Sequence, residues 1–67
     1  MYKVIYSMNE VPAVHFETYR ETANRDAAIN AYNACIQELK FITDALCVKL
    51  LNPKGYAMRI YDGGSDD

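Results

Sequence analysis

The sequence has few of the residues on which most cofactor and metal sites depend. Its 67 residues include three glycines, two prolines, two cysteines, one histidine and no tryptophan. None of the glycines (Gly55, Gly63 and Gly64) opens a helix, so the sequence offers no phosphate-binding loop. Two cysteines and the single His15 are too few for a zinc site or a disulfide framework. We therefore expect no cofactor, no metal and no small-molecule substrate.

Long apolar runs and an excess of positive charge are also missing. No apolar run approaches the roughly 20 residues that a membrane-spanning helix needs, and the opening MYKVIYSM does not resemble a secretory signal. Seven basic residues against nine acidic ones give a net charge of −2, which argues against a general binder of nucleic acids. We expect a cytoplasmic protein that binds no membrane and keeps Cys35 and Cys47 as reduced thiols.

The residues that are present predict one small folded domain. The composition is 51% hydrophobic and 24% charged, which excludes disorder for most of the chain. A domain of this size buries only about 60% of the surface that its unfolded chain exposes. Such thin cores are commonly stabilised by association, so a partner protein or a second copy of the chain is expected.

One amphipathic helix is predicted over residues 24–43. Asn24 can cap its first turn because a short side-chain oxygen reaches the unpaired backbone N–H groups there. Apolar residues then recur at intervals of three and four, which is the period of one helix face. The residues on this face are Ala28, Ile29, Tyr32, Cys35, Ile36, Leu39 and Ile42.

Four stretches alternate with the period of a strand, over residues 2–8, 14–20, 45–51 and 56–62. The first two are joined by NEVPA and the last two by the turn signal Asn52-Pro53-Lys54-Gly55, where Gly55 should adopt a positive φ. The order ββαββ predicts an α+β, two-layer domain over residues 1–62, with an antiparallel four-stranded sheet and one helix packed on one face. Residues 63–67 should form a flexible acidic tail, and the strand order stays open.

Alternation divides the strand residues between two faces of this sheet. The helix-facing set is predicted to be Val4, Tyr6, Val14, Phe16, Leu46, Val48, Leu50, Met58 and Ile60. The opposite face should then hold Lys3, Ile5, His15, Glu17, Tyr19, Cys47, Lys49, Leu51, Arg59 and Tyr61.

This second face is the predicted binding surface because it mixes large apolar groups with cations. Tyrosine and arginine are enriched at the centres of protein interfaces. The predicted partner-binding residues are Ile5, Tyr19, Lys49, Leu51, Arg59 and Tyr61. An ordinary solvated sheet face is the alternative. A sheet that stacks single-stranded RNA or DNA is a weaker one, because the strands lack the motifs of the RNA-recognition fold.

No set of catalytic residues is apparent. His15 and Glu17 could be imagined as an acid–base pair, but no serine or cysteine accompanies them at a spacing typical of nucleophilic catalysis. We therefore expect a protein that is not an enzyme and that works through its surface.

In its size, acidity and lack of enzymatic motifs, the chain resembles the accessory proteins of phages and other mobile elements. These include anti-CRISPR and antitoxin-type inhibitors, which occlude a host protein. The resemblance implies a small non-enzymatic inhibitor, and it transfers no site residue. A homo-oligomeric structural or regulatory module, paired through sheet faces or edges, is the alternative from another class.

Overall fold

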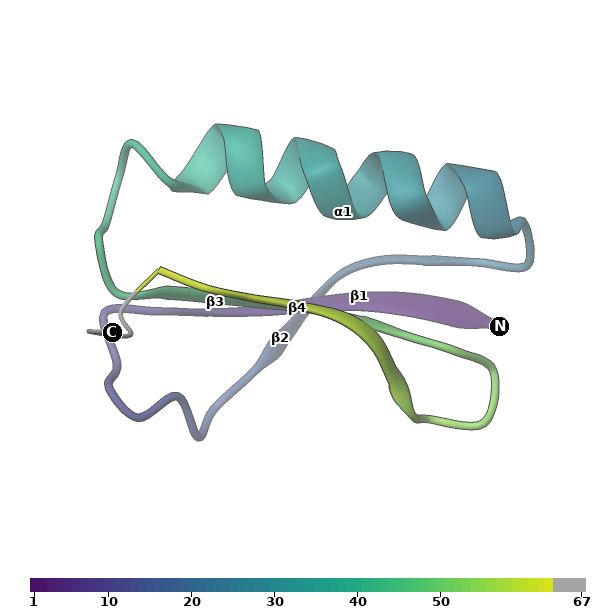
Figure 1. The fold of residues 1–67 in the computed structure, drawn as a ribbon, viewed down its shortest axis with the longest axis horizontal. Helices are drawn as coiled ribbons and strands as arrows, with labels where there is room; N and C mark the ends of the chain where they lie inside the picture. The colour runs from purple at the N-terminus through teal and green to yellow at the C-terminus, as the bar shows by residue number, and fades with distance from the viewer. Residues whose placement is uncertain (64–67) are drawn as a thin grey trace.

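The sheet has the strand order β2-β1-β3-β4, and each neighbouring pair is antiparallel. We describe residues 1–63 of a computed structural model (Figure 1). Within them the elements are β1 (Tyr2–Met8), β2 (Glu17–Thr22), α1 (Arg25–Leu39), β3 (Leu46–Leu51) and β4 (Ala57–Asp62). One helix packs on one face of the sheet, so the predicted ββαββ, α+β architecture is confirmed. The predicted tail lies outside the described residues, except for Gly63.

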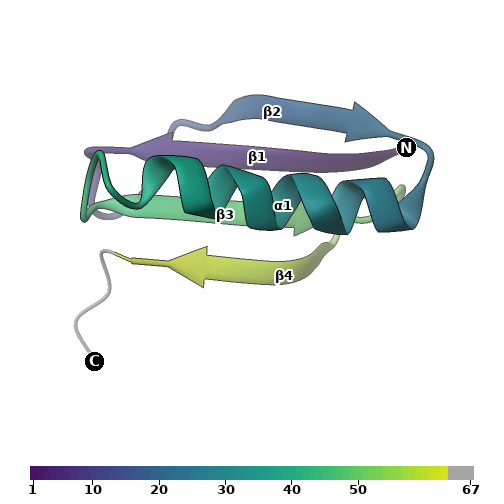
Figure 2. The ribbon, with the colours of Figure 1, turned by 90° about the horizontal axis from the view of Figure 1, so that it is seen from above.

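The connection through α1 joins two parallel strands that do not touch. β2 and β3 are both antiparallel to β1, which lies between them, so they run in the same direction. Figure 2 shows α1 lying over β1 and β3, the two central strands. The strands that come first and third along the chain therefore form the centre of the sheet.

The predicted start of the helix is confirmed. Asn24 is the N-cap, and its side-chain oxygen accepts a hydrogen bond from the N–H of Ala27 at 2.9 Å. Asp26 lies in the first turn, where a carboxylate stabilises the positive end of the helix dipole.

The predicted end of the helix is wrong, because α1 ends at Leu39. The N–H groups of Ile42 and Thr43 both donate to the carbonyl of Leu39, which closes the chain into a turn. Aromatic and β-branched residues are weaker helix formers than the alanines before them. Ile42 is consequently 67% exposed and does not extend the buried face.

The core lies between α1 and the two central strands. Its buried cluster consists of Val4, Leu46, Val48 and Leu50 from the sheet and Ala28, Ala31, Tyr32 and Cys35 from the helix. This confirms the predicted facing of β1 and β3. The small alanine side chains let the helix backbone approach the sheet closely.

The predicted hairpin turn between β3 and β4 is also confirmed. Gly55 has a φ of +90°, and its N–H donates to the carbonyl of Asn52. The side-chain oxygen of Asn52 accepts hydrogen bonds from the N–H groups of Lys54 and Tyr56, both at 2.9 Å.

β2 begins three residues later than predicted, at Glu17. The N–H groups of Val14 and His15 donate to the side chain of Glu10, so they do not contribute to a ladder. Val14 is 64% exposed in this loop, and the prediction that it faces the helix is wrong. β3 and β4 each begin one residue later than predicted.

Each edge strand carries an irregularity that changes which side its residues face. Arg20 lies opposite Val4 but Thr18 lies opposite Ile5, so Tyr19 is an extra residue in β2.

In β4, Arg59 lies opposite Leu50 and Ala57 opposite Leu51, so Met58 is the extra residue. An extra residue of this kind reverses the alternation on one side of it. For this reason the predicted facing is wrong in β2 before Arg20 and in β4 from Arg59 onward.

Candidate binding surface

The side of the sheet opposite α1 is here called the open face. The ladder register assigns to it Lys3, Ile5, Ser7, Thr18, Glu21, Cys47, Lys49, Leu51, Ala57, Ile60 and Asp62. Three of the predicted binding residues are neighbours on this face, because Ile5 lies opposite Lys49 and Leu51 is two residues further along β3. Their predicted facing is therefore confirmed.

Tyr61 and Arg59 lie on the helix side instead. Tyr61 is opposite the buried Val48 and packs against the core, and Arg59 is opposite the buried Leu50. Burial raises the pKa of Tyr32 on the helix, and the positive charge of Arg59 opposes that rise. The prediction that these two residues share a surface with Lys49 is wrong, because the extra Met58 inverts the rest of β4.

Tyr19 is also on the helix side. Its ring packs edge to face against Tyr6 at a centroid distance of 6.3 Å, and its hydroxyl donates a hydrogen bond to the carboxylate of Glu38 on α1. This bond raises the pKa of Tyr19 to about 12, because the carboxylate disfavours a second negative charge. The predicted outward facing of Tyr19 is wrong, and its hydroxyl instead joins β2 to the helix.

Two apolar residues on the open side were assigned to the core by alternation. Ile60 lies opposite Lys49 and is 59% exposed. The ring of Phe16 lies under the Lys49 ammonium group, 4.8 Å from it. The alternating pattern alone gave no signal for either residue, since the irregularities that reverse it are not visible in the sequence.

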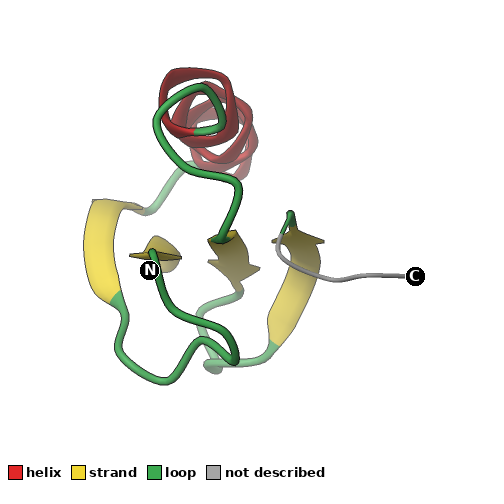
Figure 3. Ribbon diagram, turned by 90° about the vertical axis from the view of Figure 1, so that its left-hand side faces the viewer, coloured by secondary structure: helices red, strands yellow, loops and turns green. Residues whose placement is uncertain are grey.

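Both loops of the sheet's hairpins extend toward the open side. Figure 1 shows the 9–16 loop and the turn before β4 below the sheet, with α1 above it, and Figure 3 shows the same separation end-on. The open face is therefore bordered by a loop at each end of the sheet. Phe16 lies where the 9–16 loop leads into β2.

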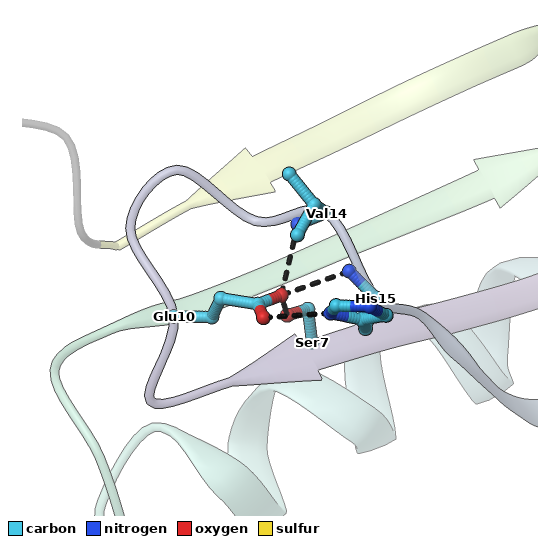
Figure 4. Close-up of polar contacts among 4 residues, drawn as sticks. All are labelled: Ser7, Glu10, Val14 and His15. Atoms are coloured by element: carbon cyan, nitrogen blue, oxygen red, sulfur yellow. Dashed lines mark hydrogen bonds and ion pairs between the residues drawn. The ribbon is translucent and has the colours of Figure 1, made fainter.

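The carboxylate of Glu10 organises the 9–16 loop (Figure 4). One of its oxygens accepts from the N–H of Val14 at 2.9 Å, the N–H of His15 at 2.8 Å and the hydroxyl of Ser7 at 3.3 Å. Its other oxygen lies 2.9 Å from Nδ1 of His15. Beside this cluster is a hollow of about 390 Å³, bordered by Tyr6, Ser7, Met8, Asn9, Glu10, His15 and Glu17.

One end of the open face is buried even though no helix covers it. Ser7 and Cys47 lie opposite each other, and they are only 5% and 7% exposed. The 9–16 loop passes over this end of the sheet (Figures 3 and 4), and its Glu10 contacts Ser7. We attribute the burial of both residues to this loop. Cys47 was predicted to face away from the helix, which is confirmed.

The polar clusters do not have the geometry of a nucleophilic active site. Glu10 lies between Ser7 and His15, whereas activation of a serine requires the histidine to contact the hydroxyl. Burial raises the pKa of Cys35 to about 11 and also raises that of Cys47, so both thiols stay protonated near neutral pH. The thiols lie on opposite faces of the sheet, and both are free. Over residues 1–63, no three potential metal-binding side chains come together.

Comparisons with protein-family models, with curated proteins and with solved structures found no match. No helix among the described residues has the length and apolar character needed to cross a membrane. The surface described above is therefore interpreted from its own geometry.

Proposed function

We propose that this chain is a small, non-enzymatic protein-binding module that occludes a host protein through its open face. The observation that carries the proposal is the row formed by Ile5, Lys49 and Ile60 across three strands. Ile60 is 59% exposed in this row, and Ile5 lies beyond Lys49 on the neighbouring strand, so the row presents apolar side chains on both sides of one cation. The binding set is thus revised to Ile5, Lys49, Leu51 and Ile60, with Phe16 at its border.

The partner that fits this surface presents aliphatic side chains beside a carboxylate. Apolar groups surround Lys49, whose ammonium would lie near the centre of the contact. A carboxylate brought against it would form a charge-assisted hydrogen bond in a place that the neighbouring apolar groups shield from water. Charge complementarity of this kind favours one partner over others.

Two other occupants fit less well. A face-to-face pair of identical copies would bring the two Lys49 side chains near each other around the symmetry axis, which is unfavourable. A nucleic acid would meet Lys3 and Lys49 together with Glu21 and Asp62, a surface with no excess of positive charge. Tyr19, Arg59 and Tyr61, whose aromatic and basic side chains could contact bases and phosphates, lie on the other side of the sheet.

The test is a photo-crosslinker placed at position 60, with Gln37 on the exposed side of α1 as the matched control. The bait is incubated with a lysate of the source cells, and the crosslinked proteins are identified by mass spectrometry. The proposal expects one protein to be crosslinked from position 60 and not from position 37. The same protein captured equally from both positions would overturn it.

Variants then measure how much of the binding the open face supplies. Ile60→Asp and Lys49→Glu should each weaken binding of the captured protein by about 1–3 kcal/mol, whereas Gln37→Glu should leave it unchanged. Lys49→Arg keeps the charge and should retain most of the affinity. A dimer in light scattering that Ile60→Asp dissociates would replace this proposal with self-association. A captured complex that nuclease removes would replace it with nucleic-acid binding.

A further inference from the structure

The Glu10 carboxylate joins two parts of the 9–16 loop to the sheet. It accepts hydrogen bonds from Val14 and His15 at the far end of the loop and from Ser7 at the end of β1. The imidazole of His15 closes the cluster at 2.9 Å from the second carboxylate oxygen. Glu10 thus holds the loop through four contacts, of which the one with the imidazole depends on the charge of His15.

This loop is also one border of the open face. It passes over the end of the sheet where Ser7 and Cys47 are buried, and it leads directly to Phe16, whose ring lies under Lys49. A displacement of the loop would uncover Cys47 and move Phe16 away from the centre of the proposed contact surface. The state of the Glu10 cluster is therefore coupled to the shape of that surface.

The two charged members of the cluster respond to pH in opposite directions. Their mutual hydrogen bond raises the pKa of His15 above its usual 6.5, and the contacts of Glu10 lower its pKa to about 2. The ion pair is therefore complete in weakly acidic solution, and it is lost as the pH rises through the raised pKa of His15. Falling pH removes it only near the pKa of Glu10.

Other charged groups near the loop are held by contacts of their own. Glu17 of β2 borders the same hollow and accepts a hydrogen bond from the Tyr6 hydroxyl of β1 at 3.4 Å. From β3, Lys49 lies over Phe16, and Asp62 of β4 lies opposite Cys47. Within the cluster, His15 is the group that loses its charge as the pH rises, and its pKa is raised by Glu10.

We propose that Glu10 and His15 form a pH-sensitive latch, which holds the 9–16 loop over the open face when His15 is protonated and loosens it when His15 is neutral. The latch itself stands on the contacts within this chain. Its effect on partner binding rests on the function proposed above.

The reactivity of the Cys47 thiol reports the latch without any partner. The wild type and His15→Gln are treated with dithiodipyridine at a series of pH values, and the modified cysteine is identified by peptide mapping, with the buried Cys35 as internal reference. The ratio of the Cys47 rate in the wild type to the Cys47 rate in His15→Gln at each pH cancels the titration of the thiol. We expect Cys47 to react about two- to fivefold more slowly in the wild type near pH 5.5, and equally fast in both proteins once the pH has risen past the pKa of His15.

A second variant and a control separate the latch from general unfolding. Glu10→Gln should speed modification of Cys47 without affecting Cys35, and NMR should show the His15 pKa falling back toward 6.5. Glu21→Gln removes an exposed carboxylate of β2 and should change neither readout. A rate ratio that is flat across pH, or a His15 pKa that Glu10→Gln leaves unchanged, would overturn the latch.

Partner capture from position 60 at the same pH values distinguishes the two proposals. Capture that changes with pH in the wild type but not in His15→Gln supports regulation of the open face, and capture that is independent of pH in both overturns that regulation. If the Cys47 rate ratio changes with pH as expected but nothing is captured from position 60, the proposed function alone has failed. If a protein is captured from position 60 but the Cys47 rate ratio does not change with pH, the latch alone has failed.

Discussion

Neighbouring residues of β3 face two surfaces with opposite characters. Val48 and Leu50 are fully buried beneath α1, whereas Lys49 between them is half-buried and lies opposite the exposed Ile60. The helix side is sealed by apolar packing, and the open side is covered at one end by a polar, titratable loop. In a chain this small, stability is thus concentrated on one face of the sheet, and the other face is available for contacts with other molecules.

The largest expected effect comes from removing a core side chain on the helix side. Leu50→Ala should lower the free energy of unfolding by about 2–5 kcal/mol, because it leaves a cavity in a fully buried site. Leu51→Ala, one residue further on the open face, should cost less than half as much. Urea unfolding of both variants measures the contrast, and equal losses would mean that the open face belongs to the core.

The next prediction compares adjacent residues of β4. Tyr61→Ala should lower the free energy of unfolding by about 1.5–3 kcal/mol, since the ring packs against the core, while Ile60→Ala should change it by less than about 0.5 kcal/mol. Thermal and urea melts of the two variants decide the facing of this strand. The reverse order of effects would restore the facing predicted by simple alternation.

A third prediction concerns the turn that joins β3 to β4. Gly55→Val should destabilise the protein by about 1–2 kcal/mol, because a β-branched residue does not tolerate a φ of +90°. An added Cβ would meet nothing within 4 Å, so the cost comes from the backbone and not from a clash. Gly55→Asn should cost less, since asparagine tolerates positive φ. Equal midpoints for Gly55→Val and the wild type would contradict the turn.

The smallest effect is expected at the rim of the helix side. Tyr19→Phe removes the hydrogen bond to Glu38 and should cost about 0.5–1 kcal/mol. Because the pKa of Tyr19 is raised from 10.0 to about 12, this contribution should be constant below pH 10 and disappear as the pH rises to 12. Unfolding of both proteins across this range tests it, and a difference that grows with pH would contradict the assignment.

The sequence predicted the centre of the sheet better than its edges. In β1 and β3 one set of alternating residues is buried by the helix, so apolar periodicity determines their facing. The edge strands are only partly covered, and their extra residues, Tyr19 and Met58, have no partner in the ladder and interrupt the alternation. Tyrosine fits either side because its ring is apolar and its hydroxyl polar. The facing of β2 and β4 therefore depended on contacts that periodicity does not encode.

The 9–16 loop was only partly predictable for a similar reason. Pro12 indicated a break after β1, but the alternating Val14 and Phe16 resembled a strand. The N–H of Val14 instead donates to Glu10 within the same loop, and the ring of Phe16 lies under Lys49 of β3. A hydrogen bond inside the loop and a contact with a distant strand thus replace the strand pairing that alternation predicted for Val14 and Phe16.

The central position of β1 also determines when the fold can form. Its residues pair with β3 from Lys3 opposite Leu51 to Met8 opposite Leu46, so the two strands at the heart of the sheet are separated in the sequence by β2 and α1. The helix and the β3–β4 hairpin can form from local contacts, but the core closes only when β1 has been brought to β3 across the intervening segment. A growing chain on the ribosome would therefore keep this core open until β3 had emerged. Folding should then occur in a single cooperative step.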